Sequence, residues 1–189
     1  MVDLPRSGSR KWTGIVAGDT DSYTLNVLAI DVADAVRGAG GLMFDRRHSG
    51  WTVRVFVTGT TDFSPLQILG AQGFSHDGVT ALRAMPPHTA LALSSAAAAR
   101  SSLLGSDVWA RWRRASAEVM LWGEPPGELR GHLVGMEHRL SGAGHAFKAR
   151  AWAACGQGEV LPRDERFHGT GRVCTPLNPD LTTFAVDTG

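Results

Sequence analysis

The sequence contains few of the residues that mark a disulfide framework or a metal site. Its 189 residues include two cysteines, Cys155 and Cys174, and no CxxC pair. We therefore expect reduced thiols in a cytoplasmic protein. Three histidines, His132, His138 and His145, are separated by five and six residues. That spacing matches no compact ligand motif such as HExxH, so no metal site is predicted.

Long apolar runs and cofactor fingerprints are also absent. No apolar stretch approaches the length of a membrane span, and the N-terminus lacks the apolar core of a signal peptide. No GxGxxG follows a predicted strand, and neither GxxxxGK[ST] nor GxSxG occurs. The formal net charge of +1 does not favour a nucleic-acid binder that relies on bulk attraction. We expect a cytoplasmic protein without a membrane partner, and its cofactor remains unknown.

The clearest structural signal lies between Gly50 and Gly59. Alternate residues from 51 to 57 are Trp, Val, Val and Val, which is typical of a buried strand. A hydroxyl-rich turn follows, and then Ser64 and Pro65, which suit the first turn of a helix. The pattern predicts a strand, a loop and a helix in that order.

Predicted strands and helices alternate along the rest of the chain. Further strands are predicted at 89–93, 118–122 and 133–140, with a weak one within 74–85. Helices are predicted at about 23–37, 65–69, 96–104, 107–115 and 141–156. This alternation indicates an α/β, Rossmann-like layered fold with a mostly parallel sheet flanked by helices.

The stretch from Gly38 to Ser49 allows two interpretations. Residues 42–44 could form a strand paired with 51–57, or a helix could resume at Gly41 and continue to His48. We favour the helix, because Ser49-Gly50 is a natural connection from a helix to a strand. Glycine costs roughly 1 kcal/mol relative to alanine inside a helix, so the glycines indicate close packing against a neighbour.

Composition divides the chain into three parts. We expect an N-terminal arm at 1–18, an α/β domain at 19–155 and an irregular, extended C-terminal tail at 156–189. The segments that carry a resemblance to known proteins are 41–46, 50–55, 66–71, 121–123 and 137–140. They resemble a family of uncharacterised proteins from high-G+C bacteria. The resemblance supports the domain assignment and implies no activity.

Polar side chains follow several predicted strands, and in parallel sheets ligands bind outside the carboxyl ends of strands. Hydroxyl groups, backbone amides and a guanidinium could hold an anion there, and a histidine could transfer a proton. The same residues could instead cap helices or form surface pairs. The candidate ligand-binding residues are Thr58, Thr60, Thr61, Asp62, Ser94, Ser95, Glu124, Glu137, His138 and Arg139.

No group of residues identifies a reaction, so catalytic residues stay unknown and the sequence does not decide whether the protein is an enzyme. The preferred hypothesis is a non-catalytic binding or regulatory module that acts through protein contacts. Its tail could bind a partner or a second copy of the chain, and the six tryptophans suit an interface. The alternative is an enzyme or sensor that binds a small phosphorylated or carboxylated ligand at the strand ends.

Overall fold

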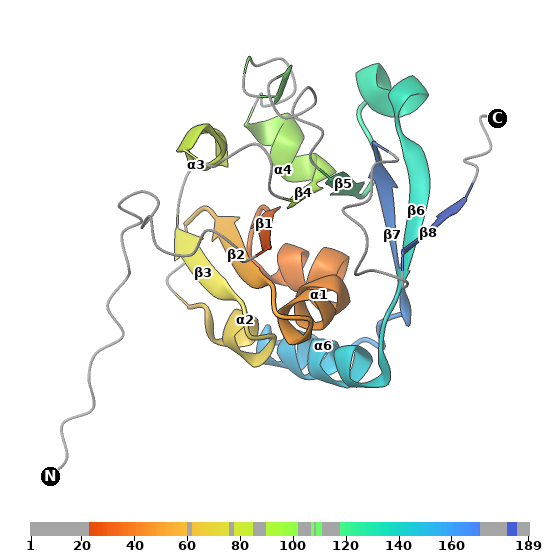
Figure 1. The fold of residues 1–189 in the computed structure, drawn as a ribbon. Helices are drawn as coiled ribbons and strands as arrows, with labels where there is room; N and C mark the ends of the chain where they lie inside the picture. The colour runs from red at the N-terminus through yellow and green to blue at the C-terminus, as the bar shows by residue number, and fades with distance from the viewer. Residues whose placement is uncertain are drawn as a thin grey trace, which may run out of the picture.

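A single mixed sheet lies between two layers of helices (Figure 1). The computed structural model describes residues 23–59, 62–75, 78–84, 90–101, 107, 109–110, 118–170 and 181–184. Within them the sheet has eight strands in the order β3-β2-β1-β4-β5-β7-β6-β8. The predicted α/β fold class is therefore confirmed.

The described strands are β1 (Thr24–Leu28), β2 (Thr52–Val57), β3 (Gln72–Ser75), β4 (Ala90–Ser94), β5 (Val119–Trp122), β6 (Val134–Arg139), β7 (Asp164–Gly169) and β8 (Leu181–Phe184). The described helices are α1 (Val32–His48), α2 (Ser64–Ile68), α3 (Gly78–Ala84), α4 (Ser95–Arg100), the 3-10 helix η2 (Gly127–His132) and α6 (Gly142–Ala154). No helix in these ranges is long and apolar enough to cross a membrane.

The sheet has a parallel half and an antiparallel half. Strands β3, β2, β1, β4 and β5 run parallel to their neighbours, whereas β7, β6 and β8 join by antiparallel pairing. From β1 the sheet extends to one side through β2 and then β3, and to the other side through β4 and then β5. The connections thus reverse between β1 and β4, and ligands of open α/β sheets bind at such a reversal.

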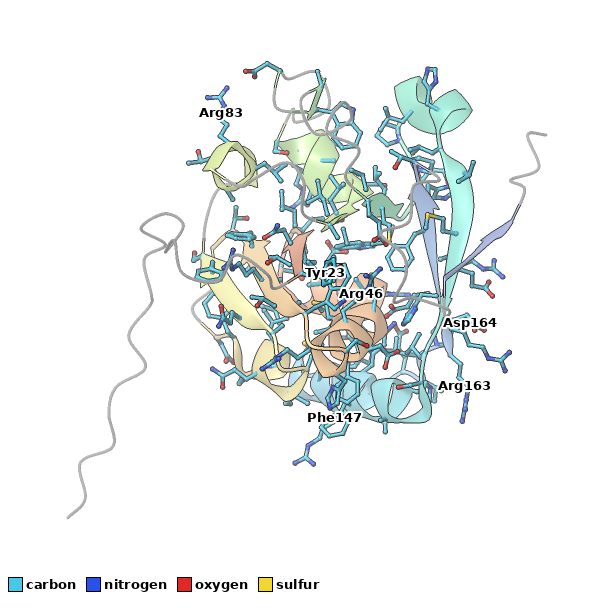
Figure 2. The ribbon with its side chains drawn as sticks, in the orientation of Figure 1. Tyr23, Arg46, Arg83, Phe147, Arg163 and Asp164 are labelled. Carbon is cyan, nitrogen blue, oxygen red and sulfur yellow. The ribbon has the colours of Figure 1, made fainter. Side chains whose placement is uncertain are left out.

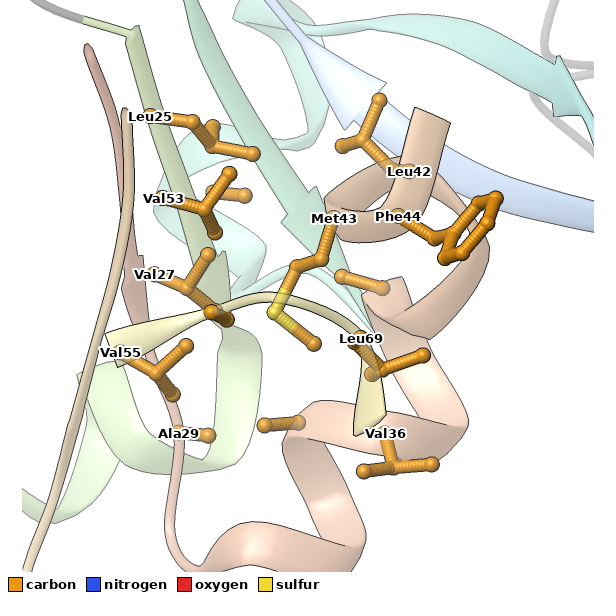
Figure 3. Close-up of a cluster of buried hydrophobic side chains, with 14 of the residues drawn as sticks. Leu25, Val27, Ala29, Val36, Leu42, Met43, Phe44, Val53, Val55 and Leu69 are labelled. Atoms are coloured by element: carbon orange, nitrogen blue, oxygen red, sulfur yellow. The ribbon is translucent and has the colours of Figure 1, made fainter. Parts of the chain in front are cut away.

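The inner parallel strands β1, β2, β4 and β5 are largely buried on both faces, whereas β3 at the edge of the sheet is exposed or half-buried. Leu25 and Val27 of β1 pack with α1, as do the alternate valines of β2 (Figure 3). Leu28 and Phe56 point to the opposite face, where α3 and α4 lie. Because side chains on both faces of these inner strands are buried, the sequences of the strands are nearly continuously apolar.

That property explains why the predicted helix at 23–37 is wrong at its start. Residues 24–28 form β1, and α1 begins only at Val32, capped by Asp31. Two-sided burial removes the polar alternation that would distinguish a strand from a helix. The weak strand predicted within 74–85 is wrong as well, because this part contains the end of β3 and all of α3.

The predicted resumption of a helix at 41–48 is confirmed. α1 has non-helical backbone angles at Ala39 and then continues to His48. A Cβ on Gly41 would clash with Leu140, and one on Gly40 would lie 3.1 Å from Cγ of Lys148. The glycines thus allow α1 to lie close to the end of β6 and to α6. This close packing is what the free-energy cost of glycine in a helix indicated.

Part of the predicted tail belongs to the sheet. Residues 164–169 form β7, which lies between β5 and β6, and 181–184 form β8. The folded unit therefore extends beyond residue 155. The N-terminal arm at 1–18 lies outside the described residues.

A buried ion pair joins β7 to the two helices beneath the sheet. Glu165 accepts hydrogen bonds from the backbone N–H groups of Gly41 (2.7 Å) and Leu42 (2.8 Å), just after the kink in α1. Lys148 of α6 donates to the same carboxylate at 2.6 Å. Both charged side chains are 1% exposed. The carboxylate thus caps the second half of α1 and neutralises a buried ammonium group.

Removing this carboxylate should weaken the whole fold. We expect Glu165→Ala to lower the free energy of unfolding by about 3–5 kcal/mol, because Lys148 would keep a buried charge without a partner. Glu137→Ala is the matched control, since its pair with Arg166 (3.5 Å) is largely exposed and should contribute at most about 1 kcal/mol. Urea denaturation measures both, and equal losses would contradict this role for Glu165.

Candidate functional site

A cavity of about 620 Å³ opens beside the carboxyl end of β5. Its walls come from the first half of α1, from Trp122 and Gly123 at the end of β5, and from the start of β7 (Figure 1). The segment 159–162, which connects α6 to β7, completes the rim. The cavity therefore lies where ligands bind in folds of this kind, and its size suits a small molecule.

A hydrogen-bonded tryptophan fixes one wall. Trp122 donates from Nε1 to Oδ1 of Asp34 at 3.0 Å, and Oδ2 of Asp34 accepts from the backbone N–H of Ile30 at 3.0 Å. The indole packs directly on Gly38, where an added Cβ would clash with the ring. The end of β1, the first turns of α1 and the end of β5 are thus joined in one rigid unit.

Charges of both signs line the cavity. Four carboxylates and three cations contribute, and they are Asp34, Glu159, Asp164, Glu165, Arg37, Lys148 and Arg166. Arg37 and Glu159 form an ion pair of 3.4 Å across the rim. Asp164, labelled in Figure 2, lies at the start of β7, the strand that supplies one wall of the cavity. The lining is nearly neutral as a whole.

The structure brings some of the predicted site residues to this edge of the sheet. The hydroxyl of Thr58 donates to the carbonyl of Ile30 at 3.5 Å, which joins the ends of β1 and β2. Ser94 accepts from the N–H of Ala97 at 3.4 Å and caps α4, and Ser95 lies beside Gly123. None of these side chains lines the cavity.

The other residues predicted near these strand ends have local roles or remain undescribed. Asp62 accepts hydrogen bonds from the N–H (2.9 Å) and the hydroxyl (2.7 Å) of Ser64, so it closes a turn before α2. These bonds lower the pKa of Asp62. Glu124 is exposed and follows Gly123. Thr60 and Thr61 lie outside the described residues.

Glu137, His138 and Arg139 lie on β6, one strand away from the cavity. They pair in register with Arg166, Glu165 and Asp164 of β7, respectively. These three residues of β7 line the cavity instead. Sequence reasoning thus selected β6, whereas the structure uses the neighbouring strand. The difference arises because β7 lies within 156–189, the segment that is predicted to be an irregular tail.

His138 belongs to a polar cluster between β6, α1 and α6. Its Nε2 lies 3.0 Å from Oδ2 of Asp45, which also accepts from the backbone N–H of Ser141 at 3.1 Å. The Ser141 hydroxyl accepts from the N–H of Gly144 and caps α6. His138 is 1% exposed, and its Nδ1 has no hydrogen-bond partner among the described residues. His138 thus contacts Asp45 at the point where Ser141 caps α6, which indicates a structural role.

Burial by itself would raise the pKa of Asp45, but hydrogen bonds from His138 and Ser141 outweigh it and hold the pKa below its ordinary value of 3.8. A carboxylate with a lowered pKa stabilises the fold above its unfolded pKa. That contribution is lost as the pH falls through the lower, folded value. The cluster should therefore weaken in acid, below about pH 4.

We expect Asp45→Asn to destabilise the protein by about 2–3 kcal/mol at pH 6, because charge-assisted hydrogen bonds are lost. The variant should also lose less stability than the wild type between pH 5 and pH 3. Denaturant titrations at these pH values measure both effects. Asp62→Asn, at a fully exposed carboxylate, is the control and should change stability far less. An unchanged acid dependence in Asp45→Asn would contradict the role assigned to this cluster.

Sequence reasoning missed most of the cavity. Asp34 and Arg37 fall in the helix predicted at 23–37 and are absent from the candidate residues, and 159–166 falls in the predicted tail. One signal was available, because Trp122 and Gly123 were predicted at a strand end, where a cavity was expected. The contact between α1 and β7 spans more than 120 residues of sequence and leaves no local pattern.

Comparison with known proteins gives a fold and no family. No family model matches the chain, and no curated protein matches its sequence. Solved structures with a similar fold include a deacetylase triple mutant of the teicoplanin biosynthetic pathway. It shares 11% identity at a TM-score of 0.55, over 88% of this chain and 100% of that one. The A40926 pseudoaglycone deacetylase Dbv21 shares 13% identity at a TM-score of 0.51, over 82% and 100%.

These likenesses overturn the preferred functional hypothesis. The non-catalytic module that acts through protein contacts is wrong as a leading hypothesis, because the two similar chains named above are deacetylases. At 10–13% identity, these likenesses show the architecture of the chain alone.

A third structure with this fold is the zinc-inhibited form of teicoplanin deacetylase Orf2, at 10% identity and a TM-score of 0.50, over 88% of this chain and 100% of that one. The described part of this chain does not fit a metal ion. It contains no group of three or more His, Cys, Asp or Glu side chains placed to hold one. Near β1, both oxygens of Asp34 already accept hydrogen bonds, and Asp31 caps α1. No step through a metal is therefore derived.

Proposed function

We propose that the protein is an enzyme or a ligand sensor that binds a small polar molecule in the cavity between α1, β5 and β7. The observation that carries this proposal is the position of the cavity. It lies beside the carboxyl end of β5, where α/β folds bind ligands, in a fold shared with deacetylases.

The charges of the lining favour a ligand of low net charge. Four carboxylates face three cations, and two of the cations are paired with carboxylates of the same lining. A phosphorylated ligand would meet more negative than positive charge. A molecule rich in hydroxyl and amide groups, or a zwitterion, suits such a lining better. The proposal thus keeps the ligand site of the alternative hypothesis and replaces its anionic ligand.

Deacetylation is the reaction class that the similar structures suggest. In it, water adds to the carbonyl carbon of an N-acyl group, the C–N bond breaks, and the amine leaves with a proton while the acyl group becomes a carboxylate. Asp164 is the cavity carboxylate to test first as the base that accepts a proton from water, because both oxygens of Asp34 already accept hydrogen bonds. A sensor would bind the same molecules without this step.

A binding screen tests the proposal directly. Thermal-shift measurements with N-acyl amino sugars, sugar phosphates, carboxylates and divalent metals should give a hit among the neutral amides. A ligand at one hundred times its dissociation constant stabilises the fold by about 2.7 kcal/mol, which is readily visible. Calorimetry then gives the dissociation constant, and release of acetate is assayed for each hit.

A variant that fills the cavity tests the position of the proposed site. Asp164→Arg puts a long side chain into the cavity and should weaken binding at least tenfold. Gln72→Arg adds the same side chain to exposed β3, at the opposite edge of the sheet, and should bind as the wild type does. Equal affinity in the two variants would contradict this position of the site, and a screen without hits would contradict the proposed function.

Two expectations from the sequence stay predictions. One is a partner or a second copy of the chain that binds through 156–189. The other is membership of a family of uncharacterised proteins from high-G+C bacteria. Neither is needed for ligand binding in the cavity.

A further inference from the structure

One apolar side chain at the rim of the cavity is almost fully in water. Val160 is 93% exposed, whereas the other large apolar side chains that are exposed in the described part of the chain reach 50% at most. Two of those have aromatic partners, because Tyr23 stacks on Trp51 and Phe147 stacks on Phe44. Val160 lines the cavity instead. Single exposed valines are common in proteins, so its surroundings decide its meaning.

The chain on either side of Val160 is anchored. Glu159 forms its ion pair with Arg37 of α1 at 3.4 Å. Leu161 is 6% exposed in the core, and its carbonyl lies 3.3 Å from Nε2 of His145. Two residues further on, the carbonyl of Arg163 accepts from the N–H of Leu140 at 3.0 Å. These contacts hold Val160 at the rim.

Trp122, which is 6% exposed, supplies a small second apolar surface to the same cavity. Its indole N–H is occupied by Asp34, and the ring is fixed against Gly38. What Trp122 can still offer a ligand is ring carbon, which binds apolar groups. Pro162 lies on the rim and adds a further apolar surface without a backbone donor.

We propose that the ligand carries a short apolar group, such as an acyl chain, beside its polar part, and that Val160 and Trp122 bind this group. The inference rests on the proposed function and specifies its substrate class as N-acyl polar molecules whose acyl group is longer than acetyl. The polar part contacts the charged side chains of α1 and β7. The acyl chain covers Val160, which removes its exposed surface from water.

A homologous series of probes tests this class. The dissociation constants of N-acetyl-, N-butyryl- and N-hexanoyl-glucosamine are measured by calorimetry on the full-length protein. Affinity should rise by up to about fourfold for each methylene group that is buried. In Val160→Ser the rise should be much smaller. Val134→Ser is the matched control, because Val134 is 42% exposed on β6 and lies outside the cavity lining.

The outcomes separate this inference from the proposed function. Affinity that rises with chain length in the wild type and in Val134→Ser, but not in Val160→Ser, supports it. Affinity that is independent of chain length, or an equal rise in all three proteins, overturns it while the observed binding upholds the proposed function. Binding of none of the probes overturns the inference, and the broader screen then decides the proposed function. Melting curves of both variants confirm that each is folded.

Discussion

The cavity depends on the contacts that the buried carboxylate of Glu165 makes. It binds two backbone N–H groups after the kink in α1 and the ammonium group of Lys148, so it joins β7, α1 and α6 at one buried point. Burying both charges costs free energy that only close geometry offsets. Because α1 and β7 form opposite walls of the cavity, this contact sets the distance between them.

The kink in α1 makes the arrangement possible. Non-helical angles at Ala39 interrupt the helix and present the N–H groups of the next turn to Glu165. Glycines on both sides of the kink allow Trp122, Lys148 and Leu140 to pack against the helix backbone. The first half of α1 can then direct Asp34 and Arg37 to the cavity, while the second half packs beneath the sheet (Figure 3).

The sequence predicted elements better than it predicted the site. β2 and β5 were recognised because short apolar runs end at glycines, and α6 because Ser141 can cap a helix. β1 was mistaken for a helix, since a strand buried on both faces has no polar alternation. β7 was missed because the buried, charged Glu165 interrupts its apolar pattern between Gly- and Pro-containing segments. The cavity needs β7, so it could not be predicted without the contact between Glu165 and α1.

A small polar ligand in the cavity would lie beside Trp122. NMR spectra of the tryptophan indole N–H groups during titration with N-butyryl-glucosamine detect it directly, with the Trp122 signal assigned from Trp122→Phe. We expect the Trp122 signal to shift, while those of Trp51 and Trp109, buried in the cores on either side of the sheet, stay in place. Shifts confined to other tryptophans, or no shift at millimolar ligand, would contradict binding in this cavity.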